Sequence, residues 1–251
     1  MSAVPQVTRL RHELRRRKVQ VARVERLAPR MLRVVLCGAE LEGFTSSAFD
    51  DHIKLFFDGA GGAQEMRDFT PRRFDSRTGE LWIEFFLHAE GPAAEWAARA
   101  LAGLSLDVGG PRGSSVVSAD GIDAHLLIGD ETALPAMARR LEELPLGARA
   151  RVFVEVDDTE EWRTFPMPSG RTVVWVPRGP KPEAPAAAMI STLGAVDLRT
   201  RSFCWVAMET QAARAVRRFL QERGVDRHWI KAAGYWQRAR AGTHERIADD
   251  E

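Results

Sequence analysis

The chain has 251 residues, enough for one large domain or two of modest size. Hydrophobic residues make up 45% and charged residues 28%, which is typical of soluble globular domains and argues against a disordered or fibrous class. The 36 basic residues nearly balance the 35 acidic ones, so a net charge of +1 offers no global field for nucleic acid or a membrane surface. We therefore expect any anion to be recognised by a local cluster.

The two cysteines, Cys37 and Cys204, both lie in apolar runs typical of strands. A disulfide framework or a metal site is not expected, and a reducing, cytoplasmic location fits best. The basic N-terminus, residues 1–17, lacks the apolar segment of a signal peptide and is expected to form a solvated arm. No run approaches the roughly 18 apolar residues of a membrane span, so no stable membrane association is expected.

Short strands separated by turn signals fill the first half of the chain and predict an antiparallel barrel over residues 18–120. One helix is predicted at 91–101, where Pro92 suits the first turn and Trp96 lies on an apolar face. The strands are expected at 19–24, 31–37, 53–57, 69–74 and 80–87.

After residue 121 strands alternate with helices, which predicts an α/β domain over residues 121–251 with a parallel sheet covered on both faces. The change of pattern at Ser118-Ala119-Asp120-Gly121 indicates the domain boundary. The expected strands are 125–129, 150–156, 172–176 and 202–207, and the expected helices are 131–144, 184–193 and 209–223.

The segment 67–75 has the order of cation, aromatic ring and hydroxyl that a flavin nucleotide needs. The guanidinium of Arg67 offers a planar fork of donors to a pyrophosphate, the ring of Phe69 can cover a flavin face, and the hydroxyl of Thr70 can reach a ring heteroatom. The alternative is a basic, exposed strand without chemistry.

Four further blocks follow in order: His88 with Gly91-Pro92-Ala93-Ala94-Glu95-Trp96-Ala97, Gly110-Pro111-Arg112-Gly113-Ser114, Gly129-Asp130-Glu131-Thr132-Ala133-Leu134-Pro135-Ala136, and Gly234-Tyr235-Trp236. Together with 67–75 they resemble the siderophore-interacting protein family, over about 18–236. The resemblance implies a two-domain ferredoxin-reductase-like fold, with an FAD-binding barrel and an NAD(P)H-binding-like α/β domain. It also implies reduction of chelated Fe(III) to Fe(II), with NAD(P)H or ferredoxin as electron donor.

The resemblance assigns roles within these blocks. Arg67 takes the pyrophosphate, while Phe69 and Thr70 contact the flavin ring. Family members usually have Tyr in place of Phe69, so we expect retuned flavin binding rather than none. The other expected cofactor contacts are His88, Gly91, Pro92, Ala93, Gly110, Pro111, Arg112, Gly113, Ser114, Thr132, Tyr235 and Trp236. Thr132 has an alternative role as a helix cap, which Asp130 could fill equally well.

Two features of the second domain bear on the electron donor. A Gly-x-Gly-x-x-Gly turn is absent, and Asp130 and Glu131 at a strand end would repel a phosphate. Met208 occupies a position where the family usually has Gly before Glu, and it is expected to crowd a nicotinamide.

Ferric siderophores are large and often anionic, so a reductase needs an open, cationic cleft. Lys54, Arg112 and Arg238 are the expected substrate cations, although each could be a solvated surface residue. No Cys or His cluster suits iron held by the protein, and outer-sphere electron transfer requires no catalytic acid or base.

The leading hypothesis is a cytoplasmic FAD-dependent ferric-siderophore reductase that is a monomer or a weak dimer. One alternative is a general NAD(P)H-dependent flavin or ferric reductase without siderophore preference. The other is a siderophore- or flavin-binding module that does no redox chemistry.

Overall fold

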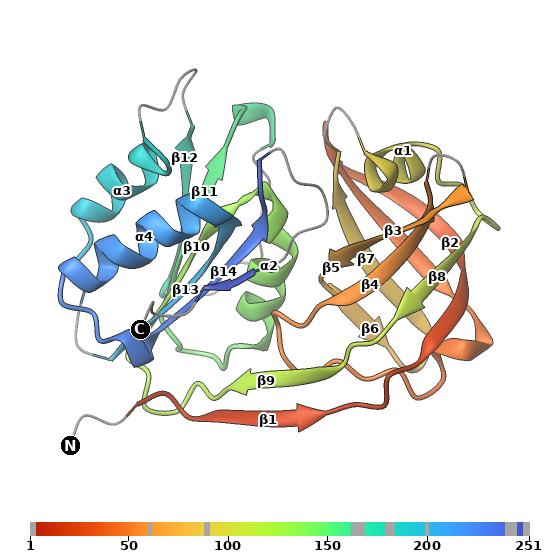
Figure 1. Ribbon diagram of the computed structural model, residues 1–251. Coiled ribbons are helices and arrows are strands. Elements are labelled where there is room, and N and C mark those ends of the chain that lie inside the picture. The colour runs from red at the N-terminus through yellow and green to blue at the C-terminus, as the bar shows by residue number, and fades with distance from the viewer. Residues whose placement is uncertain are drawn as a thin grey trace. The chain divides into compact units, whose positions relative to one another are not determined.

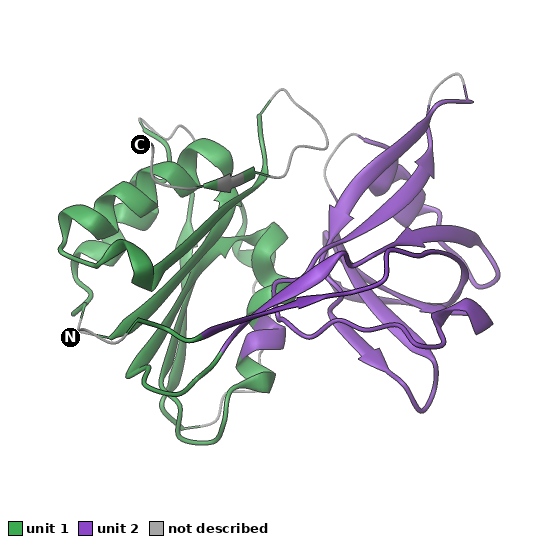
Figure 2. Cartoon of the chain, turned by 60° about the horizontal axis from the view of Figure 1, so that its bottom comes forward, with its two compact units in different colours: residues 1–6, 118–137, 141–251 green, residues 7–117, 138–140 purple. Residues whose placement is uncertain are grey.

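The computed structural model describes residues 4–59, 62–87, 91–161, 169–178, 184–198, 201–238 and 245–247 (Figure 1). The chain divides into two compact units (Figure 2). The barrel unit consists of residues 7–117 and 138–140, and the sheet unit of residues 1–6, 118–137 and 141–251. No helix within the described ranges is long and apolar enough to cross a membrane.

The barrel unit is built on a curved antiparallel sheet of seven strands in the order β5-β4-β8-β2-β3-β7-β6 (Figure 1). Its strands are β2 (Arg16–Ala28), β3 (Met31–Cys37), β4 (Ile53–Asp58), β5 (Gln64–Phe69), β6 (Arg73–Asp75), β7 (Glu80–Phe86) and β8 (Ser105–Gly109). Alternate residues of β4 are buried, as inward-facing strand positions are. Helix α1 (Pro92–Ala98) packs Trp96 against Phe57 and Phe85 of this core. The predicted antiparallel barrel is confirmed.

The strand predicted at 69–74 is wrong. β5 ends at Phe69, and Thr70, Pro71 and Arg72 connect it to β6. Pro71 has no N–H to donate to a ladder, so the chain leaves the sheet at this point. The flavin-like motif therefore spans the end of a strand and the turn that follows.

Part of the basic N-terminus is paired. Strand β1 (Val7–Arg11) forms a two-stranded antiparallel ribbon with β9 (Gly113–Val117). All five side chains of β1 are exposed. A Cβ on Gly113 would lie 2.5 Å from the carbonyl oxygen of Leu10, so glycine is what lets the two backbones approach.

The sheet unit contains six strands in the order β12-β11-β10-β13-β14-β15, of which all but β15 run parallel. The strands are β10 (Ala124–Asp130), β11 (Ala150–Val156), β12 (Arg171–Pro177), β13 (Ser202–Glu209), β14 (Ile230–Trp236) and β15 (Glu245–Ile247). The helices are α2 (Leu134–Glu143), α3 (Ala187–Gly194) and α4 (Thr210–Glu222).

Helices cover both faces of the parallel sheet, as predicted. On one face, Ile128 of β10 packs in a core cluster with Met189 of α3 and Val216 of α4. On the other face, a Cβ placed on Gly129 would lie 2.8 Å from the terminal methyl group of Met137 in α2. The parallel strands are therefore packed on both faces, and their carboxyl ends form the edge at which such sheets bind ligands.

We expect Gly129→Ala to destabilise the protein by about 3 kcal/mol or more, because a new methyl group there would lie 2.2 Å from the carbonyl oxygen of Ala207. A backbone atom of a central strand cannot rotate away. Gly194→Ala is the matched control, since nothing lies within 4 Å of its Cβ position, and it should change stability by less than ~1 kcal/mol. Urea unfolding followed by tryptophan fluorescence measures both; equal midpoints for the two variants would contradict the packing argument.

Candidate functional site

The predicted site residues on strands β4 and β5 lie on two opposite faces of the sheet. Phe69 pairs with Ile53 and Arg67 pairs with Leu55, both of which are buried inward-facing residues of β4. Arg67 and Phe69 therefore lie on the inner side of the β4–β5 ladder. Lys54 lies on the opposite side, where its Nζ is 2.7 Å from the Asp68 carboxylate.

Phe69 presents a fixed aromatic surface. Its ring centroid lies 4.4 Å from that of Phe85 and 6.5 Å from that of Phe57, and its side chain packs against the barrel core. The residue is only half-buried, so part of its surface is not covered by the protein. A planar ring held in this way can stack against a second planar ring system.

Arg67 is oriented by its own strand. Its Nη2 lies 2.5 Å from Oε2 of Glu65, and its Nη1 donates to the carbonyl oxygen of Met66 at 2.9 Å. A guanidinium carries five N–H donors, so these two partners leave donors for a phosphate oxygen. The contact with Glu65 also places a carboxylate beside any anion that Arg67 would bind.

Thr70 is buried, and its hydroxyl makes no hydrogen bond to another described residue. The turn that carries it is held by Arg139, a buried residue of the barrel unit. Arg139 Nη1 donates to the carbonyl oxygen of Pro71 at 2.9 Å and to Oγ of Ser46 at 2.8 Å. The hydroxyl donor is therefore available to a ligand at a position that the backbone fixes.

The predicted diphosphate cradle is described only in part, because His88 lies outside the described residues. Gly91 precedes α1 with a φ of +120°, and nothing lies within 4 Å of its Cβ position. Pro92 occupies the first turn, and Ala93 follows with a short side chain. The helix start is thus open on this side, and its first N–H groups have no acceptors within the helix.

The loop 110–114 contains both exposed and buried residues. Arg112 is exposed, whereas Gly110, Pro111 and Ser114 are buried. Ser114 Oγ donates to Oδ2 of Asp51 at 2.6 Å and accepts from the backbone N–H of Ser47. It lies 2.7 Å from Nε2 of His12, which donates to it in the matching tautomer. These three bonds use the full capacity of a hydroxyl, so the structure does not support the expected flavin contact of Ser114.

At the carboxyl end of the parallel sheet, Asp130 is fully buried and accepts four hydrogen bonds. The donors are the backbone N–H and hydroxyl of Thr132 (3.0 and 2.5 Å), the N–H of Glu209 (3.1 Å) and Nε1 of Trp236 (2.8 Å). Burial raises the pKa of Asp130, although its bonds from Thr132 and Trp236 act in the opposite direction. Asp130 is therefore the cap, and the Thr132 hydroxyl is committed to it.

The second acid at this strand end, Glu131, is paired with a cation. Arg178 lies 3.0 Å from Glu131 and 3.0 Å from Glu155, and it also contacts Asp157. Burial raises the pKa of Glu131, while the charge of Arg178 lowers it. The repulsion that Glu131 was expected to exert on a phosphate is thus partly neutralised by Arg178.

The expectation that Met208 crowds a nicotinamide is wrong. Its side chain is wholly buried in the cluster that packs β13 against α3 and α4, together with Cys204 and Val206. Of the remaining predicted residues, Tyr235 packs edge-on against Trp205 with ring centroids 6.0 Å apart. Arg238 is exposed, and its backbone N–H donates to Glu209.

Sequence reasoning did not single out three residues that support the site: His12, Asp51 and Arg139. Their partners lie far away in the chain, with separations of 102 residues for His12 and Ser114, 63 for Asp51 and Ser114, and 93 for Arg139 and Ser46. No local pattern encodes such pairs. Among the described residues, no group of three or more His, Cys, Asp or Glu side chains is arranged to hold a metal ion.

The residues around the end of β5 suit a flavin nucleotide. A fixed and partly uncovered ring, a buried hydroxyl without a hydrogen-bond partner among the described residues and an incompletely used guanidinium lie within four consecutive residues. These groups match a flavin ring face, a ring heteroatom and a pyrophosphate respectively.

Comparison with known proteins extends this result to both units. The profile described as "Siderophore-interacting protein" matches residues 122–239, and that described as "Siderophore-interacting FAD-binding domain" matches residues 20–65 and 62–115. The NADPH-dependent ferric-chelate reductase of Escherichia coli (strain K12) is 33% identical over 91% of this chain and 95% of its own length. The ferric vibriobactin reductase ViuB of Vibrio cholerae serotype O1 is 31% identical over 89% of this chain and 90% of its own. A siderophore utilization protein from T. fusca has a crystal structure with a TM-score of 0.86 at 35% identity, covering 95% of this chain and 98% of that chain.

Proposed function

The chain belongs to the siderophore-interacting protein family, and from this membership we propose that it is an FAD-dependent ferric-siderophore reductase that uses electrons from NAD(P)H. The observation that carries the proposal is the end of β5, where the half-buried ring of Phe69 is followed by Thr70, whose hydroxyl has no hydrogen-bond partner in the part of the chain that the structure describes. Relatives that span nearly the same length are a ferric-chelate reductase and a ferric vibriobactin reductase.

The barrel unit supplies the groups that would hold FAD. Phe69 would lie against the ring, the Thr70 hydroxyl would donate to it, and Arg67 would bind the pyrophosphate through its remaining N–H donors. A flavin held by these residues would supply the chemistry that links a two-electron hydride donor to a one-electron acceptor. Phe85 and the Arg139–Pro71 hydrogen bond keep the ring and the turn in place.

The substrate is a ferric chelate that keeps its iron while the iron is reduced. Outer-sphere transfer requires contact between the chelate and an exposed flavin edge, but no ligand exchange at the metal. Fe(II) matches hard oxygen donors less well than Fe(III) does, so reduction favours release. An anionic siderophore would be attracted by exposed cations, of which Lys54, Arg112 and Arg238 are our candidates.

The nicotinamide side belongs to the sheet unit. Met208 offers no obstacle there because its side chain is buried. Trp236 donates to Asp130, and this bond joins the carboxyl end of β14 to that of β10 across the intervening strand β13. We propose that this end of the sheet receives NAD(P)H, with Tyr235 and Trp236 as the aromatic contacts.

We expect Lys54→Ala to raise the apparent KM for an anionic ferric siderophore about 3- to 5-fold, the size of an exposed charge interaction. The flavin content should stay full, because Lys54 lies on the other side of the ladder from Phe69. Asp68→Asn is the matched counterpart: it frees the charge of Lys54 and should lower the same KM. Steady-state kinetics with a ferric siderophore check both, and a shift in the same direction for the two variants would exclude Lys54 from the substrate site.

A general ferric reductase without siderophore preference is the second candidate, because one relative is named as an NADPH-dependent ferric-chelate reductase. Rates with ferric citrate, ferric EDTA and a catecholate siderophore at equal concentration distinguish the two functions. Equal kcat/KM values for all three chelates would favour the general enzyme.

A further inference from the structure

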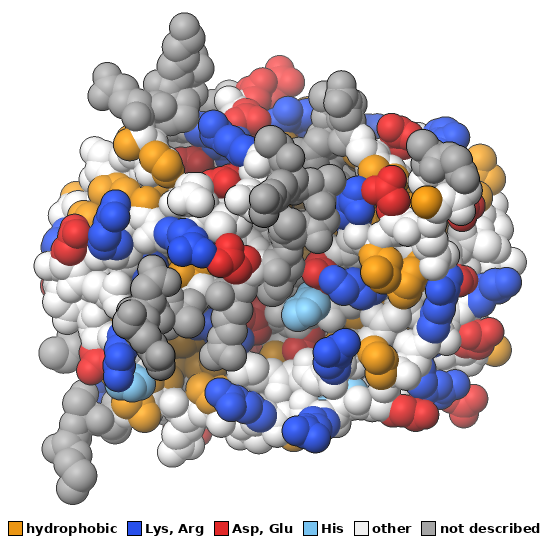
Figure 3. All heavy atoms as spheres, in the orientation of Figure 1, with side chains coloured by type: hydrophobic (Ala, Val, Ile, Leu, Met, Phe, Trp, Pro, Cys, Tyr) orange, Lys and Arg blue, Asp and Glu red, His pale blue; other side chains and the backbone are white. Residues whose placement is uncertain are grey.

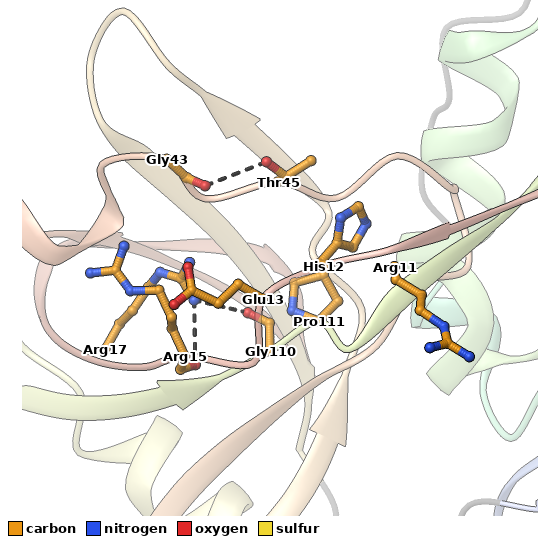
Figure 4. Close-up of a pocket in the computed structure, with 9 residues that line it drawn as sticks. All are labelled: Arg11, His12, Glu13, Arg15, Arg17, Gly43, Thr45, Gly110 and Pro111. Carbon is orange, nitrogen blue, oxygen red and sulfur yellow. Dashed lines mark hydrogen bonds between the residues drawn. The ribbon is translucent and has the colours of Figure 1, made fainter.

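A pocket of about 220 Å³ lies in the barrel unit, near the start of β2 and the end of β8 (Figure 4). It is lined by Arg11, His12, Glu13, Arg15, Arg17, Gly43, Thr45, Gly110 and Pro111. It shares Gly110 and Pro111 with the loop discussed above, but it includes neither the Arg67–Thr70 segment nor the start of α1. The pocket therefore overlaps the expected cofactor contacts only at Gly110 and Pro111.

The wall of this pocket contains a buried cation that has only neutral partners. Arg17 is 4% exposed, and its Nη1 donates to the carbonyl oxygens of Arg15 at 3.3 Å and Gly110 at 3.1 Å, which are two of the dashed lines in Figure 4. On another side, the Arg17 guanidinium lies 5.4 Å from the centre of the Phe44 ring. Its Nε is buried without a hydrogen-bond partner among the described residues, none of which forms an ion pair with it.

The surroundings of Arg17 add positive charge. Arg15 stands close to it near Gly110, whereas Arg11 points away from this group (Figure 4). Burial lowers the pKa of Arg17 and the charge of Arg15 lowers it further, while Glu13 and Glu40 act in the opposite direction. Glu13 is the one carboxylate among the nine lining residues. By contrast, basic and acidic side chains are interspersed over the viewed face of the described chain (Figure 3).

A buried guanidinium that forms no ion pair with a described residue loses hydration, and a bound anion would offset that loss. The pocket volume of about 220 Å³ exceeds the roughly 30 Å³ share of one water molecule, so there is room for a small organic or inorganic anion. Carboxylate and phosphate oxygens match the planar arrangement of N–H donors in an arginine side chain. Because these oxygens are charged, they accept stronger hydrogen bonds from arginine than a water molecule does.

We propose that this pocket is a binding site for a small oxyanion, carrying carboxylate or phosphate groups, that pairs with Arg17 and Arg15. Glu13 opposes the ligand and limits its affinity. The site is additional to the flavin and substrate sites proposed above, and binding to it does not depend on electron transfer.

The test is isothermal titration calorimetry of the full-length, FAD-loaded protein with inorganic phosphate and, separately, with citrate, at constant ionic strength in HEPES and sodium chloride. One saturable site per chain is expected for at least one of the two anions, and the tighter one identifies the class. Arg17→Met should weaken binding about 10-fold or more, and Glu13→Gln should tighten it about 3-fold. Arg9→Met is the matched control, because Arg9 is exposed on β1 outside the lining, and it should bind as the wild type does.

Unchanged affinity in Arg17→Met, or absence of a saturable site for both anions, would overturn the proposal. If Arg17→Met fails to fold, Glu13→Gln decides alone, because a folding defect cannot tighten binding; affinity equal to or below that of the wild type would then contradict the site. A site present in the apoprotein but lost on loading with FAD would show that the pocket belongs to the flavin site, which also overturns the proposal.

Discussion

Replacing Arg178 by methionine is expected to lower the free energy of unfolding by about 3–5 kcal/mol, the usual cost of removing one partner from a buried ion pair. The side chains of Glu131 and Glu155 are 3% and 7% exposed, so neither carboxylate can regain full hydration once the guanidinium is gone. Methionine keeps much of the apolar stem of arginine, which separates the loss of charge from the loss of packing.

The loss of unfolding free energy in Arg178→Met should depend on pH, and the pKa of Glu131 determines whether it grows or shrinks as the pH falls. Burial raises its pKa and Arg178 lowers it, so removal of Arg178 leaves the pKa of Glu131 raised further. When the pKa of a carboxyl is higher in the folded than in the unfolded protein, its ionisation destabilises the fold. This destabilisation is complete at a pH above the folded-state pKa, and it disappears as the pH falls below the unfolded-state pKa. The difference in stability between wild type and variant should therefore shrink as the pH is lowered from 8 towards 5.

Urea unfolding at several pH values measures this effect. Arg151→Met is the matched control, because Arg151 is exposed on β11, and it should cost less than ~0.5 kcal/mol. Adding Glu131→Gln to Arg178→Met should restore part of the stability at pH 8. A constant difference between pH 5 and 8, with no rescue by the second substitution, would mean that the buried carboxylates do not cause the loss.

Replacing Arg67 by alanine is expected to weaken FAD binding about 100-fold or more, because the two or more charge-assisted hydrogen bonds that we propose between Arg67 and the pyrophosphate would be lost. The protein should then purify with little or no flavin. The fold should be retained, since Arg67 is partly exposed and its described contacts are confined to Glu65 and Met66 of its own strand. Visible absorption at purification and titration of the apoprotein with FAD give the two readouts.

Arg77→Ala is the matched control for Arg67. Its side chain lies in the same unit and is 88% exposed, and the flavin content should not change. Glu65→Gln tests the same site from the other side: it removes the carboxylate bound to Arg67 and should tighten FAD binding about 3-fold. Full flavin content in Arg67→Ala would mean that the motif at the end of β5 has another role.

The fold is predictable where the local pattern is strong. The strands predicted at 31–37 and 150–156 coincide with β3 and β11, since both segments are runs of β-branched and apolar residues bounded by turn signals. The prediction at 69–74 failed because apolar Phe69 and Phe74 outweighed Pro71, which carried the correct signal for a strand end.

The site is predictable only in part. Arg67, Phe69 and Thr70 are neighbours in the sequence, so their order was sufficient to predict a flavin motif. The bond between Asp130 and Trp236 joins residues 106 positions apart, and no local pattern encodes it. For Met208, the alternation of side chains along a strand is a better predictor of its environment than the family pattern. It shares the parity of Cys204 and Val206, and all three side chains lie in the core.

The reductase function is tested most directly by reduced protein mixed with a metal chelate in an anaerobic stopped-flow experiment. FAD-loaded protein is reduced with one equivalent of NADPH, and flavin absorbance is followed after addition of a ferric siderophore or its Ga(III) analogue, which has similar size and charge but accepts no electron under these conditions. We predict that the ferric complex reoxidises the flavin at a rate that rises with its concentration, and that a ferrous chelator traps two Fe(II) per flavin. The Ga(III) complex should leave the flavin reduced. Equal reoxidation with iron and gallium, or no reoxidation with either, would contradict the assignment.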